Sequence, residues 1–136
     1  MTDPTALLAA ALAARDGAYA PYSKFAVGAA LLDHDGTVWT GANVENASYG
    51  LSICAERNAI FGAVTAGGTR RFVAVAVAGP DGTTTLPCGA CRQVLWEFAP
   101  ELQVIYADER GVASMPLAEL LPHAFGPAQL IEAQSR

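Results

Sequence analysis

The sequence predicts a layered α/β domain in which helices pack against a mixed β-sheet. Two observations lead to this fold class. Apolar runs bounded by turn residues alternate with segments of helical spacing, and the elements follow the order helix, hairpin, helix, strand, helix, strand. A chain of 136 residues is long enough to bury a substantial core, and we expect residues 1–136 to form a single domain.

The first half of the chain predicts a helix and a β-hairpin. Asp3 and the proline after it are typical of a helix N-cap and first turn, and Gly17 is a typical helix end. The continuous apolar run 25–32, the turn sequence Asp-His-Asp-Gly and the partly alternating run 37–44 together predict two paired strands.

The second half predicts two further helices, each followed by a strand. We expect a helix over 52–66, ended by two glycines, then a buried strand over 72–78, a helix over 89–98 and a strand over 102–107. The residues beyond 107 are rich in turn formers and predict at most short helices. The buried side of the helix over 52–66 is expected to carry Ile53, Ile60, Phe61 and Val64.

Charge and hydrophobicity restrict the classes of partner. Eight basic against thirteen acidic residues give a net charge of −5, and the basic residues are scattered, which argues against polynucleotides and favours a small-molecule substrate. The apolar run 6–14 is too short to span a bilayer and follows an acidic residue, so we expect neither a membrane segment nor a signal peptide, and a cytoplasmic protein. The alanine-rich apolar fraction leaves surface for subunit contacts, which predicts an oligomer.

The cysteines supply the strongest chemical signal. Cys54-Ala55-Glu56 and Pro87-Cys88-Gly89-Ala90-Cys91 provide three thiolates and a carboxylate close to the first of them. A catalytic zinc site uses three protein ligands and leaves one position for water, whereas a structural site uses four. The motifs therefore predict a zinc-bound water with Glu56 as its proton carrier. A redox Cys-x-x-Cys pair and three buried cysteines are the alternatives, and an odd cysteine count argues against a disulfide framework.

Both cysteine motifs fall at expected helix N-termini, where the helix dipole favours a thiolate. Cys88 and Cys91 are three residues apart and therefore lie on one helix face. Glu56 follows Cys54 by two residues, which do not face each other in a regular helix, so this hypothesis requires an irregular first turn or a side chain that reaches back. In the alternative interpretation Glu56 only complements the helix dipole.

Three thiolates on Zn²⁺ leave the cluster with a charge of −1, which opposes ionisation of a bound water. Arg57 follows Cys54 by three residues, and we expect it to donate hydrogen bonds to the metal-bound sulfurs, with Arg92 or Gln93 as a lesser contributor. The alternative is that Arg57 is an ordinary solvated helix residue. The end of the second hairpin strand places Asn43 and Glu45 on one face, an amide and a carboxylate that suit a hydroxyl-bearing ligand.

Four segments, read together, resemble the short, homotetrameric class of cytidine deaminase. They are Pro21-Tyr22-Ser23-Lys24-Phe25-Ala26-Val27-Gly28-Ala29-Ala30, Asn43-Val44-Glu45-Asn46-Ala47-Ser48-Tyr49, Cys54-Ala55-Glu56-Arg57 and Pro87-Cys88-Gly89-Ala90-Cys91-Arg92-Gln93. The resemblance runs from about residue 7 to residue 125. It implies a three-layer α/β/α cytidine-deaminase-like fold with a mixed central sheet, and a cytoplasmic homotetramer with one Zn²⁺ per subunit. It further implies hydrolytic deamination of cytidine and deoxycytidine to uridine and deoxyuridine in pyrimidine salvage.

The resemblance also implies roles for single residues. Cys54, Cys88 and Cys91 would hold the zinc, and Glu56 would shuttle protons. By the same resemblance, Phe25 would pack beside the nucleoside, and Asn43 and Glu45 would bind the ribose hydroxyls. The backbone of Ala55 would contact the base. Tyr49 would lie near a subunit interface, and Phe125 would stack on the base from an adjacent subunit. His34 and His123 are expected to be solvated.

Three other functions remain as alternatives. A blasticidin-S-type deaminase shares the zinc motifs, although the Asn43 to Asn46 segment fits nucleoside sugars better. Deamination of bases within a nucleic acid is opposed by the acidic charge. A noncatalytic zinc-stabilised module would bind the metal without an exchangeable water.

Overall fold

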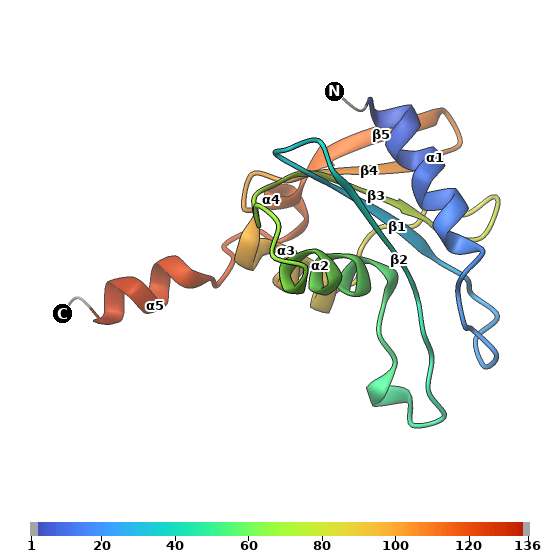
Figure 1. The fold of residues 1–136 in the computed structure, drawn as a ribbon, viewed down its shortest axis with the longest axis horizontal. Helices are drawn as coiled ribbons and strands as arrows, with labels where there is room; N and C mark the ends of the chain where they lie inside the picture. The colour runs from blue at the N-terminus through green and yellow to red at the C-terminus, as the bar shows by residue number, and fades with distance from the viewer. Residues whose placement is uncertain (1–2, 135–136) are drawn as a thin grey trace.

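A five-stranded mixed sheet lies between two layers of helices in the computed structural model, which describes residues 3–134 (Figure 1). The strand order is β2-β1-β3-β4-β5, in which β3 and β4 are parallel and every other neighbouring pair is antiparallel. The strands are β1 (Gly28–Asp33), β2 (Val38–Ala42), β3 (Phe72–Ala78), β4 (Gln103–Asp108) and β5 (Gly111–Pro116).

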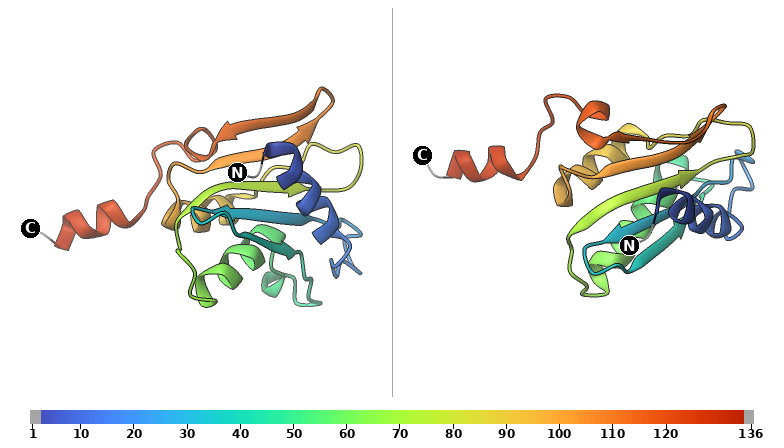
Figure 2. Two further views of the ribbon diagram at one scale, coloured as in Figure 1. Left: turned by 45° about the horizontal axis from the view of Figure 1, so that its top comes forward. Right: turned by 90° about the horizontal axis from the view of Figure 1, so that it is seen from above.

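Helices cover both faces of this sheet (Figure 2). Helix α1 (Pro4–Arg15) packs on one face, and α2 (Ala55–Thr65), α3 (Gly89–Phe98) and the short α4 (Leu117–Leu120) pack on the other. Helix α5 (Pro127–Gln134) extends away from the rest of the protein. The predicted three-layer α/β/α architecture with a mixed central sheet is confirmed. Within residues 3–134 no helix combines the length and apolarity needed to cross a bilayer.

The alternation of side chains along β1 builds one core on each face of the sheet. Ala29 and Leu31 pack with α2 and α3, whereas Ala30 and Leu32 pack with α1. The layer toward α1 is rich in alanine, which lets the helix approach closely. At Gly28 the approach is closest, because a Cβ there would lie 2.0 Å from the backbone oxygen of Ala11.

The directions of the strands bring the two cysteine motifs together. Strands β2 and β3 both run antiparallel to β1 and therefore point the same way. Helix α2 follows β2 along the chain and α3 follows β3, so both helices begin near the carboxyl ends of these strands, at the same end of the sheet. Helix α2 is fixed on β2 at Gly41, where a Cβ would lie 2.6 Å from both the oxygen of Ala55 and the nitrogen of Ala59. The fold thus places the starts of α2 and α3 side by side.

Strand β3 and helix α3 have the predicted bounds, and three other expectations are corrected. Strand β1 begins at Gly28 rather than residue 25, because the segment 25–27 binds the side chain of Asn43 instead of pairing as a strand. Phe61 is 44% exposed rather than buried. The expected helix over 52–66 begins only at Ala55, after a short 3₁₀ turn, η1 (Tyr49–Leu51).

The expectation of a tail with at most short helices is also wrong. Strand β5 extends the sheet by pairing antiparallel with β4 over its whole length, and α5 forms two helical turns.

Candidate active site

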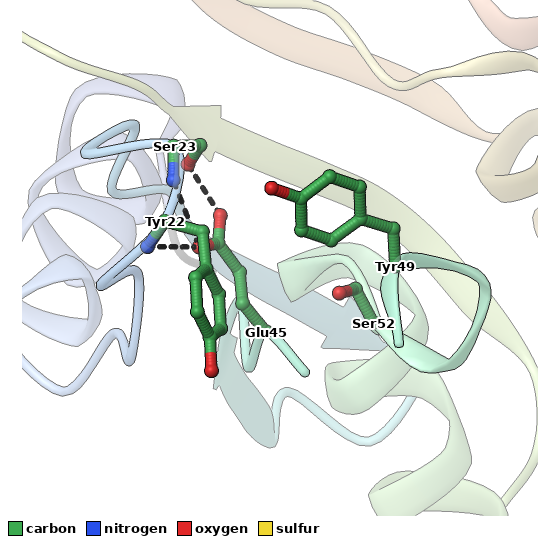
Figure 3. Close-up of a pocket in the computed structure, with 5 residues that line it drawn as sticks. All are labelled: Tyr22, Ser23, Glu45, Tyr49 and Ser52. Atoms are coloured by element: carbon green, nitrogen blue, oxygen red, sulfur yellow. Dashed lines mark hydrogen bonds between the residues drawn. The ribbon is translucent and has the colours of Figure 1, made fainter. Parts of the chain in front are cut away.

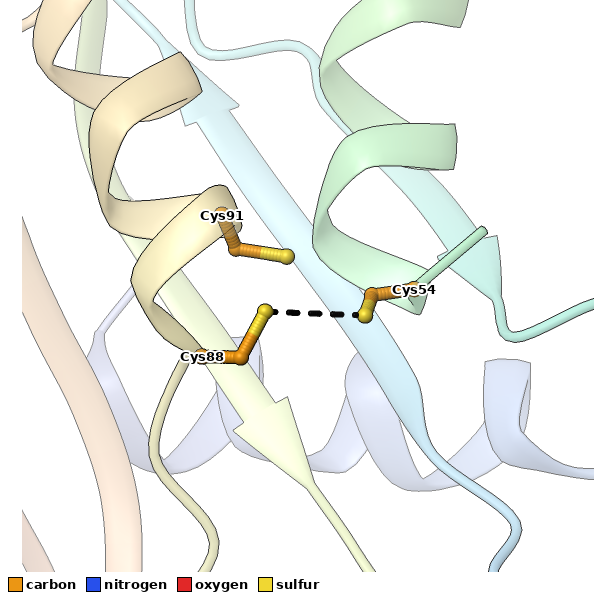
Figure 4. Close-up of side chains that lie close together, drawn as sticks. All are labelled: Cys54, Cys88 and Cys91. Atoms are coloured by element: carbon orange, nitrogen blue, oxygen red, sulfur yellow. Dashed lines mark hydrogen bonds between the residues drawn. The ribbon is translucent and has the colours of Figure 1, made fainter. Parts of the chain in front are cut away.

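The three cysteines meet at the adjoining helix starts (Figure 4). Cys54 is the N-cap of α2 and Cys88 the N-cap of α3, both with extended backbone, and Cys91 lies one turn into α3. Their sulfur atoms all lie within 4.8 Å of one another, and the Sγ atoms of Cys54 and Cys88 are 3.7 Å apart. Cys91 is fully buried and Cys88 is exposed, so the cluster lies at the surface end of the core.

This cluster has the dimensions of a zinc site. Zn–S bonds of about 2.3 Å in a tetrahedron place neighbouring sulfurs about 3.8 Å apart, close to the distance between Cys54 and Cys88. All three thiols are free of disulfides. Among the described residues no fourth histidine, cysteine or carboxylate joins the cluster. The donors therefore suit a zinc ion that keeps one position for a small molecule, as in catalytic zinc sites.

Glu56 is buried beside the cluster at the second residue of α2, with a side chain that is 4% exposed. The anticipated geometric conflict with Cys54 does not arise, because Cys54 is the N-cap and lies outside the regular helix. Burial raises the pKa of Glu56, and the neighbouring Cys54 thiolate raises it further. A carboxyl group with a raised pKa holds a proton more readily than an ordinary glutamate, which suits a residue that accepts and returns protons.

Arg57 contacts the cluster directly. Its Nη2 donates a hydrogen bond to the Sγ of Cys54 at 3.3 Å. The pKa of Cys54 is lowered to about 5 by hydrogen bonding with Cys91 and by the Arg57 guanidinium, against the effect of burial. The same contact with Cys54 raises the pKa of Arg57, so this side chain stays cationic. The expected charge partner of the thiolates is therefore in place.

A cleft of about 310 Å³ opens next to the cysteines. Most of the residues expected at the substrate line it. The lining consists of Ser23, Phe25, Val27, Asn43, Glu45, Cys54, Ala55, Glu56, Thr85 and Cys88. The ring of Phe25 is 43% exposed at this cleft, and Ala55 is fully buried at the first turn of α2. One concave surface thus combines the sulfurs and the buried carboxyl group with an aromatic ring and polar groups, as expected of a ligand site.

Asn43 and Glu45 lie beyond the end of β2, where their side chains organise the segment 22–27. The Asn43 Oδ1 accepts from the backbone N–H of Val27 at 2.9 Å, and its Nδ2 donates to the carbonyl of Phe25 at 2.8 Å. Glu45 accepts from the N–H groups of Tyr22 and Ser23. These two side chains therefore hold the loop that carries Phe25, in addition to facing the cleft.

Two residues expected near the sulfurs, Gln93 and Arg92, bond elsewhere. Gln93 does not approach the sulfurs, because its Nε2 donates to the carbonyl of Phe125 at 2.7 Å. Arg92 bonds the carbonyls of Pro87 and Leu120 instead. Tyr49 is 74% exposed and lines a second cavity, beyond Glu45.

Phe125 is 58% exposed on the segment between α4 and α5. Within the described residues it is not part of the lining of its own chain's cleft.

Besides Val27, two polar residues of the cleft were not singled out from the sequence. Ser23 lies within the Pro21 to Ala30 segment, but a serine in a loop gives no signal of its own. Thr85 precedes the second cysteine motif, where only its place in the loop before α3 brings it to the cleft. The tertiary structure alone identifies both.

Comparison with known sequences gives a consistent result. The sequence model of the family described as "Cytidine and deoxycytidylate deaminase zinc-binding region" matches residues 1–107. A Halalkalibacterium halodurans protein named cytidine deaminase is 49% identical over 125 residues, which cover 90% of this chain and 94% of the relative. A cytidine deaminase of Mycobacterium tuberculosis is also 49% identical, over 81% of this chain and 80% of the relative.

Solved structures agree with the sequence relatives. A crystal structure of cytidine deaminase from Burkholderia pseudomallei superposes with a TM-score of 0.83 at 52% identity, covering 89% of this chain and 98% of that one. The cytidine deaminase of Mycobacterium tuberculosis gives a TM-score of 0.82 at 45% identity, over 93% and 99% of the two chains.

Proposed function

This chain belongs to the cytidine and deoxycytidylate deaminase family, and from that premise we propose that it hydrolyses cytidine and deoxycytidine to uridine and deoxyuridine with release of ammonia. It is a zinc-dependent hydrolase acting on a cyclic amidine. The observation that carries the proposal is the meeting of three sulfurs beside a buried carboxyl group, with Cys54, Cys88 and Glu56 at the wall of a cleft of about 310 Å³.

Cys54, Cys88 and Cys91 are the residues that would hold the zinc, one ion per chain. Bound there, zinc supplies Lewis acidity that lowers the pKa of a water molecule toward 7. Arg57 contributes by donating to the Cys54 sulfur, which withdraws negative charge from the donor set. Because Arg57 remains cationic, this contribution persists across the physiological pH range.

Glu56 moves the protons of the reaction. It accepts one proton from the attacking water as the oxygen bonds to C4 of the cytosine ring, and it delivers this proton to N3. It then carries the second proton, from the hydroxyl group added at C4, to the amino nitrogen. The bond between C4 and that nitrogen breaks, and ammonia leaves. Burial suits Glu56 to this cycle, because it raises the pKa and so favours the protonated form that the cycle passes through.

Substrate orientation falls to the other residues of the cleft. Phe25 offers an aromatic surface for the nucleoside, and the backbone of Ala55 offers polar groups to the base at the start of α2. Asn43 and Glu45 offer an amide and a carboxylate to the sugar hydroxyls. The acidic side chain at this end of the cleft favours an uncharged nucleoside over a nucleotide.

The active assembly is proposed to be a homotetramer in which Phe125 from one chain stacks on the base bound to another. Its support is the exposure of several large apolar side chains near the cleft and along the C-terminal segment. They are Tyr19, Tyr22, Val44, Tyr49, Leu51, Phe125, Leu130 and Ile131. Apolar surface of this kind marks interaction sites in soluble proteins. We further propose that residues 1–136 form one domain and that the enzyme serves pyrimidine salvage in the cytoplasm.

An ultraviolet assay on cytidine, with the zinc content measured on the same sample, tests the function. We expect loss of cytidine absorbance together with ammonia release, in proportion to the bound zinc. Blasticidin S and a cytosine-containing oligonucleotide serve as comparison substrates. Turnover of either one in place of cytidine would contradict the proposal, and so would bound zinc with no turnover of any of the three.

A further inference from the structure

Ser23 and Glu45 separate two neighbouring cavities. Both residues line the cleft beside the cysteines and also a second cavity of about 250 Å³, whose other lining residues are Tyr22, Tyr49 and Ser52 (Figure 3). The rings of Tyr22 and Tyr49 lie 6.0 Å apart between centroids across this second cavity. The contact between Ser23 and Glu45 is therefore a shared wall.

The two oxygens of Glu45 differ in how fully they are used. Oε1 accepts two backbone hydrogen bonds, from the N–H groups of Tyr22 and Ser23, each at 3.1 Å. Oε2 accepts from the hydroxyl of Ser23. The Ser23 hydroxyl and backbone N–H lower the pKa of Glu45, so the group is an ionised acceptor at neutral pH. Because Oε1 already holds two donors, a ligand hydroxyl would approach Oε2, where it competes with the Ser23 hydroxyl.

Ser23 also connects Glu45 to Phe25. Its Oγ accepts from the backbone N–H of Phe25 at 3.0 Å while its proton is directed to Oε2 of Glu45. The intervening Lys24 has a φ of 58°, a left-handed conformation that is uncommon outside glycine and that folds the chain back between Ser23 and Phe25. A continuous chain of hydrogen bonds thus runs from the backbone of Phe25 through Ser23 to the carboxylate.

We propose that Ser23 is a positioning residue that couples recognition of a sugar hydroxyl at Glu45 to the placement of Phe25 in the cleft. The proposal rests on the nucleoside-deaminating function proposed above. A sugar hydroxyl that donates to Oε2 takes the acceptor that the Ser23 hydroxyl otherwise uses. When the sugar lacks this hydroxyl, Ser23 keeps its own bond and Oε2 is not left without a donor.

This exchange predicts how Ser23 affects substrate discrimination. In the wild type, Ser23 reduces the cost of a missing sugar hydroxyl, because it fills the acceptor itself. In Ser23→Ala no protein or sugar group donates to Oε2 when the hydroxyl is missing, so this ionised oxygen is left with water as its only donor. The preference for the nucleoside with the hydroxyl over the one without it should therefore rise about tenfold, the size expected for one hydrogen bond to a charged group.

The experiment compares cytidine with 2′-deoxycytidine and 3′-deoxycytidine, and measures calorimetric Kd values for the corresponding uridine products on the zinc-loaded protein. For at least one of the two deoxy sugars, Ser23→Ala should raise kcat/KM for cytidine divided by kcat/KM for the deoxynucleoside. It should likewise raise the Kd of the deoxyuridine divided by the Kd of uridine. The change in kcat/KM should come from KM rather than kcat. Ser23→Thr, which retains a hydroxyl, should keep the wild-type ratios. Ser23→Val, which has the shape of the threonine variant but no hydroxyl, should behave as Ser23→Ala. Ser114→Ala, on β5 at the opposite edge of the sheet, is the control.

Unchanged ratios in Ser23→Ala and Ser23→Val, with normal turnover of cytidine, would overturn the role of Ser23 and leave the proposed function intact. A wild-type protein that neither releases ammonia from cytidine nor binds uridine would instead refute the proposed function. Ser23 is exposed, so substitution does not disturb the core. If Ser23→Ala nevertheless fails to fold, the comparison of Ser23→Thr with Ser23→Val decides the question.

Discussion

The Nη2 of Arg57 lies 3.3 Å from the Sγ of Cys54, one helical turn apart at the start of α2. This contact places a fixed positive charge against a donor set that would carry an excess negative charge around zinc. This contact could be predicted from the sequence, because a residue three positions after a helix N-cap lies on the same side of the first turn. Its expected consequence is that Arg57 would offset part of the negative charge that three thiolate ligands place on a zinc ion.

Substitution of Arg57 by glutamine should therefore move the pH dependence of the reaction. Less positive charge near the sulfurs raises the pKa of the attacking water, so the acid limb of the kcat/KM profile should shift to higher pH. Partners of this kind contribute about 10- to 100-fold in activity or metal affinity. The measurement is a pH–rate profile with zinc analysis of each sample.

Arg110→Gln, in the turn between β4 and β5, is the matched control for Arg57→Gln. It should leave both readouts at their wild-type values. An Arg57→Gln enzyme with the wild-type profile and full zinc content would show that the guanidinium does not tune the site.

Replacement of Glu56 by glutamine should stop proton transfer and spare binding. Glutamine fills nearly the same buried volume but cannot carry a proton between water and substrate, so kcat should fall by at least about 10²- to 10⁴-fold. Zinc content and the Kd for uridine should stay near wild type. Near-normal turnover would remove Glu56 from the mechanism, and Glu101→Gln, beyond the far end of α3, controls for loss of a carboxylate.

Gly41 should control the position of Cys54 through the backbone of α2. In Gly41→Ala the new methyl group would meet the Ala55 oxygen and the Ala59 nitrogen at 2.6 Å, so the start of α2 must move away from the sheet. We expect loss of zinc affinity and a destabilisation of about 1–3 kcal/mol, typical of overpacking. Zinc titration and denaturant unfolding measure the two effects.

Gly62→Ala is the control in the same helix, where a Cβ meets open space. Removing a glycine from a helix interior should stabilise the protein by about 0.5–1 kcal/mol without altering zinc binding. Equal zinc affinities for Gly41→Ala and Gly62→Ala would contradict the packing argument.

Asp33 should contribute stability that depends on pH. Its side chain is 3% exposed and accepts from the backbone N–H groups of Asp35 and Thr37 and from Nε1 of Trp39. Burial would raise its pKa, but these hydrogen bonds outweigh burial and lower the pKa below its ordinary value. A depressed pKa gives stability that is present above the unfolded value of about 3.9 and is lost as pH falls through the folded value.

Asp33→Asn should accordingly lower the free energy of unfolding at pH 7 by about 1–3 kcal/mol, the cost of leaving a buried donor without its partner. The difference from wild type should shrink below about pH 4, where the unfolded-state carboxyl group becomes protonated. Urea unfolding of both proteins at pH 7 and pH 3 measures this difference in the free energy of unfolding. A difference that is constant with pH, or equal to that of the exposed Asp35→Asn, would count against this role.

The sequence anticipated those parts of the fold and site that depend on local patterns. Strand β3 is a continuous apolar run between turn residues, and α3 lies between a proline-cysteine start and a proline after its end, so both were found with correct bounds. The zinc ligands could be proposed because cysteine spacing restricts metal geometry. The meeting of Cys54 with Cys88 follows from the common direction of β2 and β3.

The remaining features depend on tertiary contacts. Strand β5 has no clear alternation and ends in proline, so its strand conformation comes from pairing with β4. Phe61 has a position on the helix that the pattern predicts to be buried, but its side chain is left 44% exposed. Gln93 follows Cys91 closely in sequence, yet the C-terminal segment folds back and provides the Phe125 carbonyl as its acceptor. The sequence around Gln93 alone does not predict that the segment carrying Phe125 lies beside it.

X-ray absorption at the zinc edge of the isolated protein measures the ligands of the metal. We expect one zinc per chain, with three sulfur neighbours at about 2.3 Å and one light atom at about 2.0 Å, which an added substrate analogue perturbs. Fewer than three sulfur neighbours, or a histidine ligand that closes the fourth position, would contradict this expectation.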